Sequence, residues 1–268
     1  MLSVSYRFLL AGVIILIIAR VLNLPLSFTK KEHSFIQLQG VLIFGVNYWL
    51  FYISELYLTS GLVGLIFSLL VIFNIINARI FLKNKLEVKV IAGGILGLMG
   101  TALVFWDDLK AFSVEDGKIL GITLTIGGTL IASLGNITSA RNTKAGIPVI
   151  SCNAYGMSYG GLTMMLIALV SGKDISFIIT TEYIASLAYL TIFGSIIASG
   201  AYLTLIGNIG AEKAAYVSLI TPVIALLIST ILEDYQWTTI SILGVLFILI
   251  GNAIALYKAQ DKETKYKT

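Results

Sequence analysis

Apolar residues run along almost the whole chain in stretches of about 20, and short polar segments separate the stretches. A helix of about 20 residues spans the hydrocarbon core of a bilayer, whereas barrel strands would be about 10 residues long and strictly alternating. The pattern predicts an all-α integral membrane protein. We expect about nine transmembrane helices, at residues 2–22, 35–57, 61–82, 88–106, 118–139, 147–170, 183–206, 214–232 and 239–257.

Composition supports this class and excludes several others. Of the 268 residues, 57% are hydrophobic and only 12% are charged, whereas a soluble domain carries about 25% charged residues. Cys152 and His33 are the single cysteine and histidine, which argues against an intrachain disulfide and against a Cys/His metal cluster. We therefore expect no metal and no cofactor. The net charge is +4. In a membrane protein the distribution of Lys and Arg indicates orientation first, so we do not take this charge as a sign of a nucleic-acid partner and expect no such partner.

The basic residues are distributed unevenly between the two sides of the predicted helices. Of the 18 Lys and Arg residues, all but Arg7, Lys110, Lys118 and Lys173 fall in the loops of one side. The positive-inside rule makes that side cytoplasmic. We therefore expect a multi-pass protein of the cell (inner) membrane whose segment 258–268 is a cytoplasmic tail, with the N-terminus outside.

Two parts of the chain resemble each other when the sequence is shifted by 151 positions. The shift aligns two glycine pairs, Gly93 with Gly244 and Gly100 with Gly251. It also aligns the basic loop 83–85 with the acidic loop 233–234, so the equivalent loops lie on opposite sides of the membrane. This is the pattern of an inverted-topology repeat, which is typical of secondary transporters. The glycines themselves favour close helix packing.

Three segments resemble the drug/metabolite transporter superfamily, in particular its EamA-like family. They are SYRFLLAG at 5–12, NYWLFYISELYLTSGLVGLIFSLL at 47–70 and GNIGAEKAAYVSLITPVIALLISTILEDYQW at 207–237. The resemblance implies two five-helix repeats and export of small metabolites or amphiphilic compounds. Two departures stand out, because the family's first helix is absent and Val71 replaces the proline that would match Pro222.

The resemblance and the shift together divide the chain into four parts. We expect an N-terminal repeat at 1–106 that lacks its first helix, an outer loop at 107–117, a complete repeat at 118–257 and the tail at 258–268. The fold is then an inverted repeat of five-minus-one plus five helices. A shortened start and a genuine nine-helix variant both stay open.

Polar side chains within the apolar helices are the candidate site residues, because lipid offers them no hydrogen-bond partner. Several fall in stripes at helical spacing and suggest a central, moderately polar cavity. The candidate solute-binding residues are Asn47, Tyr48, Tyr52, Asn74, Asn77, Asn136, Tyr155 and Tyr202. The alternative is that such groups only join helices, at about 0.6 kcal/mol per hydrogen bond. For single serines and threonines we favour this alternative, whereas Asn74 and Asn77 should face the bundle interior in either case.

Charged residues are almost absent from the middle of the predicted helices. Arg7 and Glu55 both fall near outer helix ends and could pair there, and Asp and Glu are absent at mid-depth. Proton coupling through a central carboxylate is therefore disfavoured. Pro222 interrupts the hydrogen bonding of its helix, either as a hinge or as a fixed kink. Arg7, Glu55 and Pro222 are the candidate coupling or gating residues.

We interpret the chain as a secondary transporter that works by alternating access on a small-molecule solute within the lipid bilayer. A non-transporting scaffold or truncated pseudo-transporter is the main alternative, because the first helix of the pattern is missing. A membrane enzyme is disfavoured, since the sequence contains no H-E-x-x-H, G-x-S-x-G or G-x-x-x-x-G-K-[ST] motif. Whether the chain forms a homodimer stays open.

Overall fold

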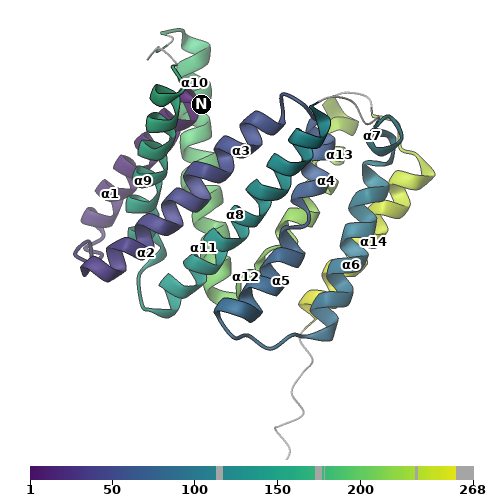
Figure 1. Cartoon of the computed structure of the whole chain (residues 1–268), viewed down its shortest axis with the longest axis horizontal. Coiled ribbons are helices and arrows are strands. Elements are labelled where there is room, and N and C mark those ends of the chain that lie inside the picture. The colour runs from purple at the N-terminus through teal and green to yellow at the C-terminus, as the bar shows by residue number, and fades with distance from the viewer. Residues whose placement is uncertain (113–116, 173–176, 178, 233–234, 258–268) are drawn as a thin grey trace, which may run out of the picture.

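The chain folds into helices joined by short loops in the computed structural model (Figure 1). The structure describes residues 1–112, 117–172, 177, 179–232 and 235–257, and within these residues the regular structure is helical, without strands. The acidic loop 233–234 and the expected tail 258–268 lie outside the described residues. The all-helical class is thus as the apolar pattern predicts.

Several helices follow one another with little or no interruption and form longer rods. The elements are α1 (Leu2–Val21), α2 (Lys30–Gly40), η1 (Val41–Val46), α3 (Asn47–Ser54), α4 (Ser60–Phe67), α5 (Leu70–Phe81), α6 (Val88–Val104), α7 (Trp106–Lys110), α8 (Lys118–Lys144), α9 (Val149–Val170), α10 (Thr181–Tyr189), η2 (Leu190–Ile197), α11 (Ala198–Ile209), α12 (Ala211–Ala214), α13 (Tyr216–Leu232) and α14 (Thr239–Leu256).

Seven rods in the described part of the chain are long and apolar enough to cross a membrane. The apolar helix α6, with 17 residues, is shorter than these seven, and α9 has 22 residues but is not one of them. Large apolar side chains at the periphery, such as Ile17, Ile80 and Leu166, are 59%, 61% and 61% exposed. Such a surface suits lipid rather than water. The count of nine spans is not confirmed by these lengths and compositions, and it stays a prediction.

Local sequence signals set where the rods begin. Thr29 and Glu32 form a reciprocal capping box at the start of α2, in which Glu32 Oε2 accepts from the Thr29 backbone N–H at 2.7 Å. The Thr59 hydroxyl accepts from the Leu62 backbone N–H at the start of α4. These side chains satisfy backbone donors that the first helical turn leaves unpaired. Gly210 joins α11 to α12 with φ of +88°, a conformation that favours glycine.

An antiparallel pair of helices lies at each edge of the molecule, α1 with α9 and α6 with α14 (Figure 1). In the second pair the backbones touch at glycines. A Cβ built on Gly100 would stand 2.6 Å from the Gly244 carbonyl oxygen, and one built on Gly251 would stand 2.6 Å from the Gly93 carbonyl oxygen. Close packing at these four glycines, which their spacing predicts, is therefore confirmed.

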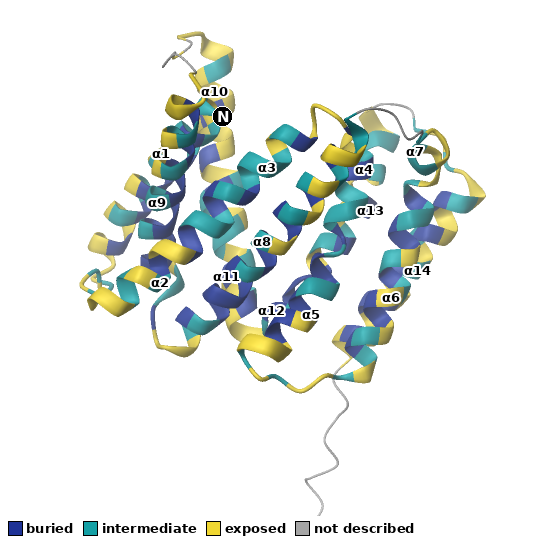
Figure 2. Ribbon diagram, in the orientation of Figure 1, coloured by how far each residue is buried: buried dark blue, intermediate teal, exposed yellow. Residues whose placement is uncertain are grey.

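Helix geometry changes in the middle of two rods. The segments η1 and η2 are π-helical, and each contains the sequence Ile-Phe-Gly, at 43–45 and at 192–194. The rod that begins with α4 breaks at residues 68–69, and the rod that begins with α12 breaks at Ala215. Such irregular turns are frequent at functional sites because they redirect side chains. Figure 2 shows buried residues gathered on the facing sides of the central helices and exposed residues at the loops.

Candidate solute cavity and its closure

A cavity of about 400 Å³ lies between the central rods, next to the irregular helix segments. Its polar lining residues are Asn47, Tyr48, Asn136, Ser199, Tyr202, Ser218 and Thr221. Its remaining lining residues are Ile43, Phe44, Phe67, Leu70, Ala132, Gly194, Ala198 and Val217. Binding sites for small molecules typically measure about 300–1,000 Å³ and combine an apolar wall with a few polar groups. The cavity fits a small organic solute.

The cavity continues toward one end of the molecule, which we call the Glu55 end. A second recess of about 340 Å³ shares Asn47, Tyr48 and Phe67 with the cavity and extends along Phe51 to Glu55. Glu55 is exposed, at the point where α3 ends. The helix terminus of α3, the start of α4 and the short helix α7 lie at this end (Figure 1).

Buried contacts separate the cavity from the opposite end. The Asn136 amide donates to the Tyr202 hydroxyl at 2.9 Å across the cavity floor. Asn74 is fully buried, and its Nδ2 donates to the Ala211 carbonyl at 2.8 Å, where α11 gives way to α12. Below these bonds, Ala78, Ala211 and further small and aliphatic residues form a core cluster. The cavity is thus sealed on this side by packed atoms.

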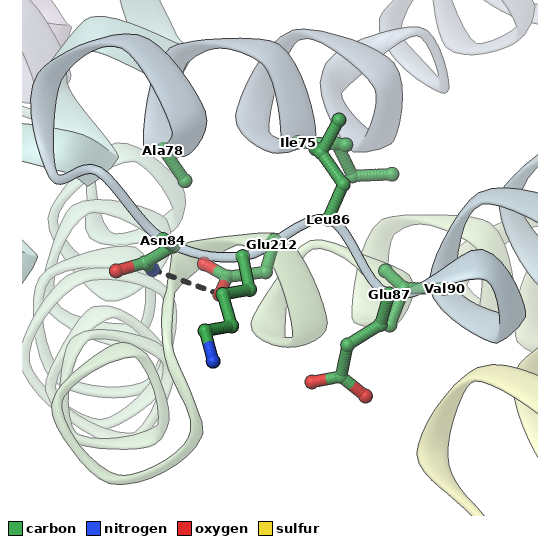
Figure 3. A pocket seen from close by; sticks show the side chains of 8 residues that line it. Ile75, Ala78, Asn84, Leu86, Glu87, Val90 and Glu212 are labelled. Atoms are coloured by element: carbon green, nitrogen blue, oxygen red, sulfur yellow. Dashed lines mark hydrogen bonds between the residues drawn. The ribbon is translucent and has the colours of Figure 1, made fainter.

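Polar and charged side chains close the same side, which we call the Glu87 end. The Asn84 amide donates to Glu212 Oε1 at 2.9 Å (Figure 3), and Lys213 Nζ donates to Glu87 Oε1 at 2.7 Å. Both contacts join the loop between α5 and α6 to helix α12. We call these four residues the Glu87 latch. The hydrogen bond from Lys213 holds the pKa of Glu87 below its ordinary value, although desolvation acts in the opposite direction.

Arg7 of α1 turns toward η2. Its Nε donates to the hydroxyl of Ser195 at 2.6 Å, and Ser195 is fully buried. The guanidinium also lies beside Tyr48, a residue of the cavity wall. Arg7 does not form the expected pair with Glu55. The ion pairs in the described part of the chain join Glu87 to Lys89 and to Lys213. Ser195 lies within reach of the half-buried guanidinium, whereas Glu55 is exposed and lines the recess at the end of α3.

Pro222 is buried inside α13 and leaves the helix continuous. Proline has no N–H, so the Ser218 carbonyl, four residues earlier, loses its helical donor. Ser218 lines the cavity, and its hydroxyl donates to the Ala215 carbonyl at 2.7 Å, at the break between α12 and α13. The proline therefore adds a backbone acceptor at cavity level.

Comparison with known proteins identifies the family. The family model described as "EamA-like transporter family" matches residues 1–106 and 119–257. The chain belongs to the EamA-like transporter family. It is therefore a multi-pass membrane transporter by family, and the lipid bilayer and a small-molecule solute are its expected environment and partner.

Curated relatives of this EamA-like chain carry transporter names. An uncharacterized transporter of Bacillus subtilis, YyaM, is 28% identical over 93% of this chain and 82% of its own length. The uncharacterized inner membrane transporter YedA of Escherichia coli is 24% identical over 95% and 82%. A probable amino-acid metabolite efflux pump of Escherichia coli is 25% identical over 74% and 68%. A solved crystal structure shares the fold with a TM-score of 0.79 at 15% identity, over 95% of this chain and 86% of that one.

The cavity of this EamA-like chain contains four of the eight residues predicted to bind solute: Asn47, Tyr48, Asn136 and Tyr202. The other four lie elsewhere. Tyr52 is 48% exposed, one helical turn further along α3 than Tyr48.

The remaining three predicted residues make hydrogen bonds away from the cavity. Asn74 bonds the Ala211 carbonyl, and Asn77 Nδ2 donates to the Ser133 hydroxyl at 2.9 Å. Tyr155 donates to the Leu26 carbonyl at 2.9 Å, close to His33. Both asparagines are buried, as predicted, but they serve contacts between helices rather than the cavity wall.

Sequence reasoning missed the apolar half of the lining. Phe44, Phe67 and Val217 face the cavity, but each sits in an apolar run where nothing in the pattern distinguishes a lipid-facing residue from a cavity-facing one. It also placed Arg7 at the outer interface with Glu55. The guanidinium reaches Ser195 because α1 packs close to η2. This tertiary contact cannot be read from the local sequence.

Proposed function

We propose that this chain is a secondary transporter that moves a small organic solute by alternating access through the cavity. The main support for this proposal is the asymmetry of the cavity. The recess runs from the cavity to Glu55, whereas the Asn136–Tyr202 bond and the Glu87 latch lie on the other side. Asn47, Tyr48, Asn136 and Tyr202 would bind the solute. Residues from both sequence halves line the cavity, so a relative motion of the halves would change its access.

The fold would comprise nine spans arranged as an inverted repeat, with repeats at 1–106 and 118–257 joined by the loop 107–117. The glycine contacts support this arrangement. Under the 151-residue shift, Gly93 becomes Gly244 and Gly251 becomes Gly100, so the contact between Gly93 and Gly251 becomes the contact between Gly244 and Gly100, which is also present. Any two-fold axis between the repeats, including one in the membrane plane, requires this exchange. The π segments η1 and η2, with a shared Ile-Phe-Gly, support it independently.

By the positive-inside rule, the basic loops support a cytoplasmic Glu87 end and an outer Glu55 end. The conformation described here is then open to the outside, and the C-terminus is cytoplasmic. Export is the proposed direction. The names of two relatives, an inner membrane transporter and a probable amino-acid metabolite efflux pump, agree with this assignment.

Solute counterflow in proteoliposomes tests the function. Vesicles loaded with one unlabelled solute from a panel of amino acids, organic acids and amphiphilic amines would take up the labelled form faster than protein-free vesicles. Tyr202→Ala would remove the wall group that bonds Asn136, and it should abolish the excess uptake while leaving insertion intact. If the wild-type protein moves no member of the panel faster than empty vesicles, the scaffold interpretation replaces transport.

A further inference from the structure

The guanidinium of Arg7 lies next to two residues of the cavity lining, Tyr48 and Gly194. Its Nε is held by the buried Ser195 hydroxyl at 2.6 Å, and its Cζ lies 5.3 Å from the centre of the Phe8 ring. Gly194, the residue before Ser195, lines the cavity. A Cβ built on Gly194 would stand 3.1 Å from Nη2 of Arg7, so the glycine leaves this edge of the guanidinium uncovered by a side chain.

The guanidinium has no counter-charge in the described part of the chain, where the ion pairs are those of Glu87. A guanidinium carries five N–H donors, of which Nε supplies one. The bond to Ser195 uses this Nε donor, and the Tyr48 hydroxyl lies beside the group. The terminal nitrogens therefore still have donors available for an oxygen anion. A charge kept inside a membrane protein without a partner is costly, and such residues commonly mark substrate pathways.

We propose that Arg7 binds a carboxylate of the transported solute, so that the substrates are small organic monocarboxylates, amino acids included. This rests on the proposed function, in which the cavity is the transport site. One cation beside the cavity matches one negative charge, because the polar groups that line the cavity are amides and hydroxyls. The aromatic lining at Phe44 and Phe67 and a volume of about 400 Å³ match a solute with a compact apolar body.

A purely structural role makes a different prediction. If Arg7 only ties α1 to η2 through Ser195, then its replacement lowers stability without changing which solutes bind. If Arg7 binds the carboxylate, its replacement removes the preference for a carboxylate over the matching amide. Arg20 provides the matched control, since it is an exposed arginine in the last turn of the same helix.

Ligand-induced thermal stabilisation of the purified full-length protein measures this preference. The probes are phenylacetate with phenylacetamide, and isovalerate with isovaleramide. For the wild type and for Arg20→Gln we expect stabilisation by the carboxylates and little by the amides. Arg7→Gln should weaken carboxylate affinity by about 10- to 100-fold, the range of a charge-assisted hydrogen bond, and Arg7→Lys should retain part of the preference.

Two results would overturn the proposal: equal response of the wild type to acids and amides, or an undiminished acid preference in Arg7→Gln. Should Arg7→Gln fail to fold, the wild-type comparison and Arg7→Lys still decide. Counterflow of the same four probes separates this proposal from the proposed function. If acids bind selectively but no flux is seen, transport alone is contradicted. If flux is seen without a preference for acids, the role of Arg7 alone is contradicted. If the probes show no binding and no flux, both proposals are contradicted.

Discussion

Adding one methyl group at Gly100 should separate α6 from α14. A Cβ at this position would stand 2.6 Å from the Gly244 carbonyl oxygen and 2.7 Å from the Ile248 backbone nitrogen. Both atoms belong to the backbone of α14, so the helix itself must move. Overpacking of this kind costs about 1–3 kcal/mol. Alanine recovers about 0.5–1 kcal/mol through its higher helix propensity, which leaves a net destabilisation of about 0–2.5 kcal/mol for Gly100→Ala.

Gly200→Ala in α11 is the matched control, because a Cβ built there meets no atom within 4 Å. It gains the same helix propensity without the collision, so we expect it to be neutral or slightly stabilising. Unfolding in mixed micelles of mild detergent and dodecyl sulfate, followed by far-ultraviolet circular dichroism, would compare both variants with the wild type. If Gly100→Ala is as stable as Gly200→Ala, the α6–α14 contact is looser than its geometry indicates and the reasoning fails.

Two further substitutions test the closure of the Glu87 end. Lys213 holds the pKa of Glu87 below the ordinary 4.5, so the stability that this pair contributes is present above pH 4.5 and is lost as the pH falls below it. Glu87→Gln should remove this pH dependence from the hydrogen exchange of α12. The effect should be under about 1 kcal/mol, because the pair is partly exposed. Asn74→Leu would remove the side-chain donor to the Ala211 carbonyl, which keeps its backbone bond from the Ala215 N–H. We expect normal insertion and lower flux per molecule, whereas less folded protein with unchanged flux per molecule would mean that Asn74 only joins helices.

Hydrophobic length and the polar positions within an apolar helix are readable from the chain alone, because each acts within one helix. The burial of Asn74 and Asn77 is an example. The spacing of Gly93 and Gly100 also predicts a tight crossing, since small residues let any neighbouring backbone approach. These signals define the class of protein and the inward faces of several helices.

The cavity could be only half predicted, because its wall depends on which helices meet. Tyr48 and Tyr52 share a helical stripe, yet only Tyr48 lines the cavity, whereas Tyr52, one turn further along α3, is exposed. Tyr155 also belongs to a polar stripe, but the loop at Leu26 captures its hydroxyl. The position of Arg7 near a helix end predicts that its side chain reaches the membrane interface, but it bonds Ser195 instead. Tertiary contacts overrule the local pattern in each case.

Alternating exposure of the cavity is tested most directly by thiol labelling at Ser199. The chain has one cysteine, Cys152, which is only 3% exposed and can be replaced by serine to give a background without cysteine. Ser199→Cys in that background would be treated with a membrane-impermeant maleimide from each side of oriented vesicles. We predict labelling from the Glu55 side in the resting protein, and labelling from the opposite side once Glu87→Gln weakens the Glu87 latch. Labelling from the Glu55 side alone, with the latch intact or weakened, would contradict alternating access.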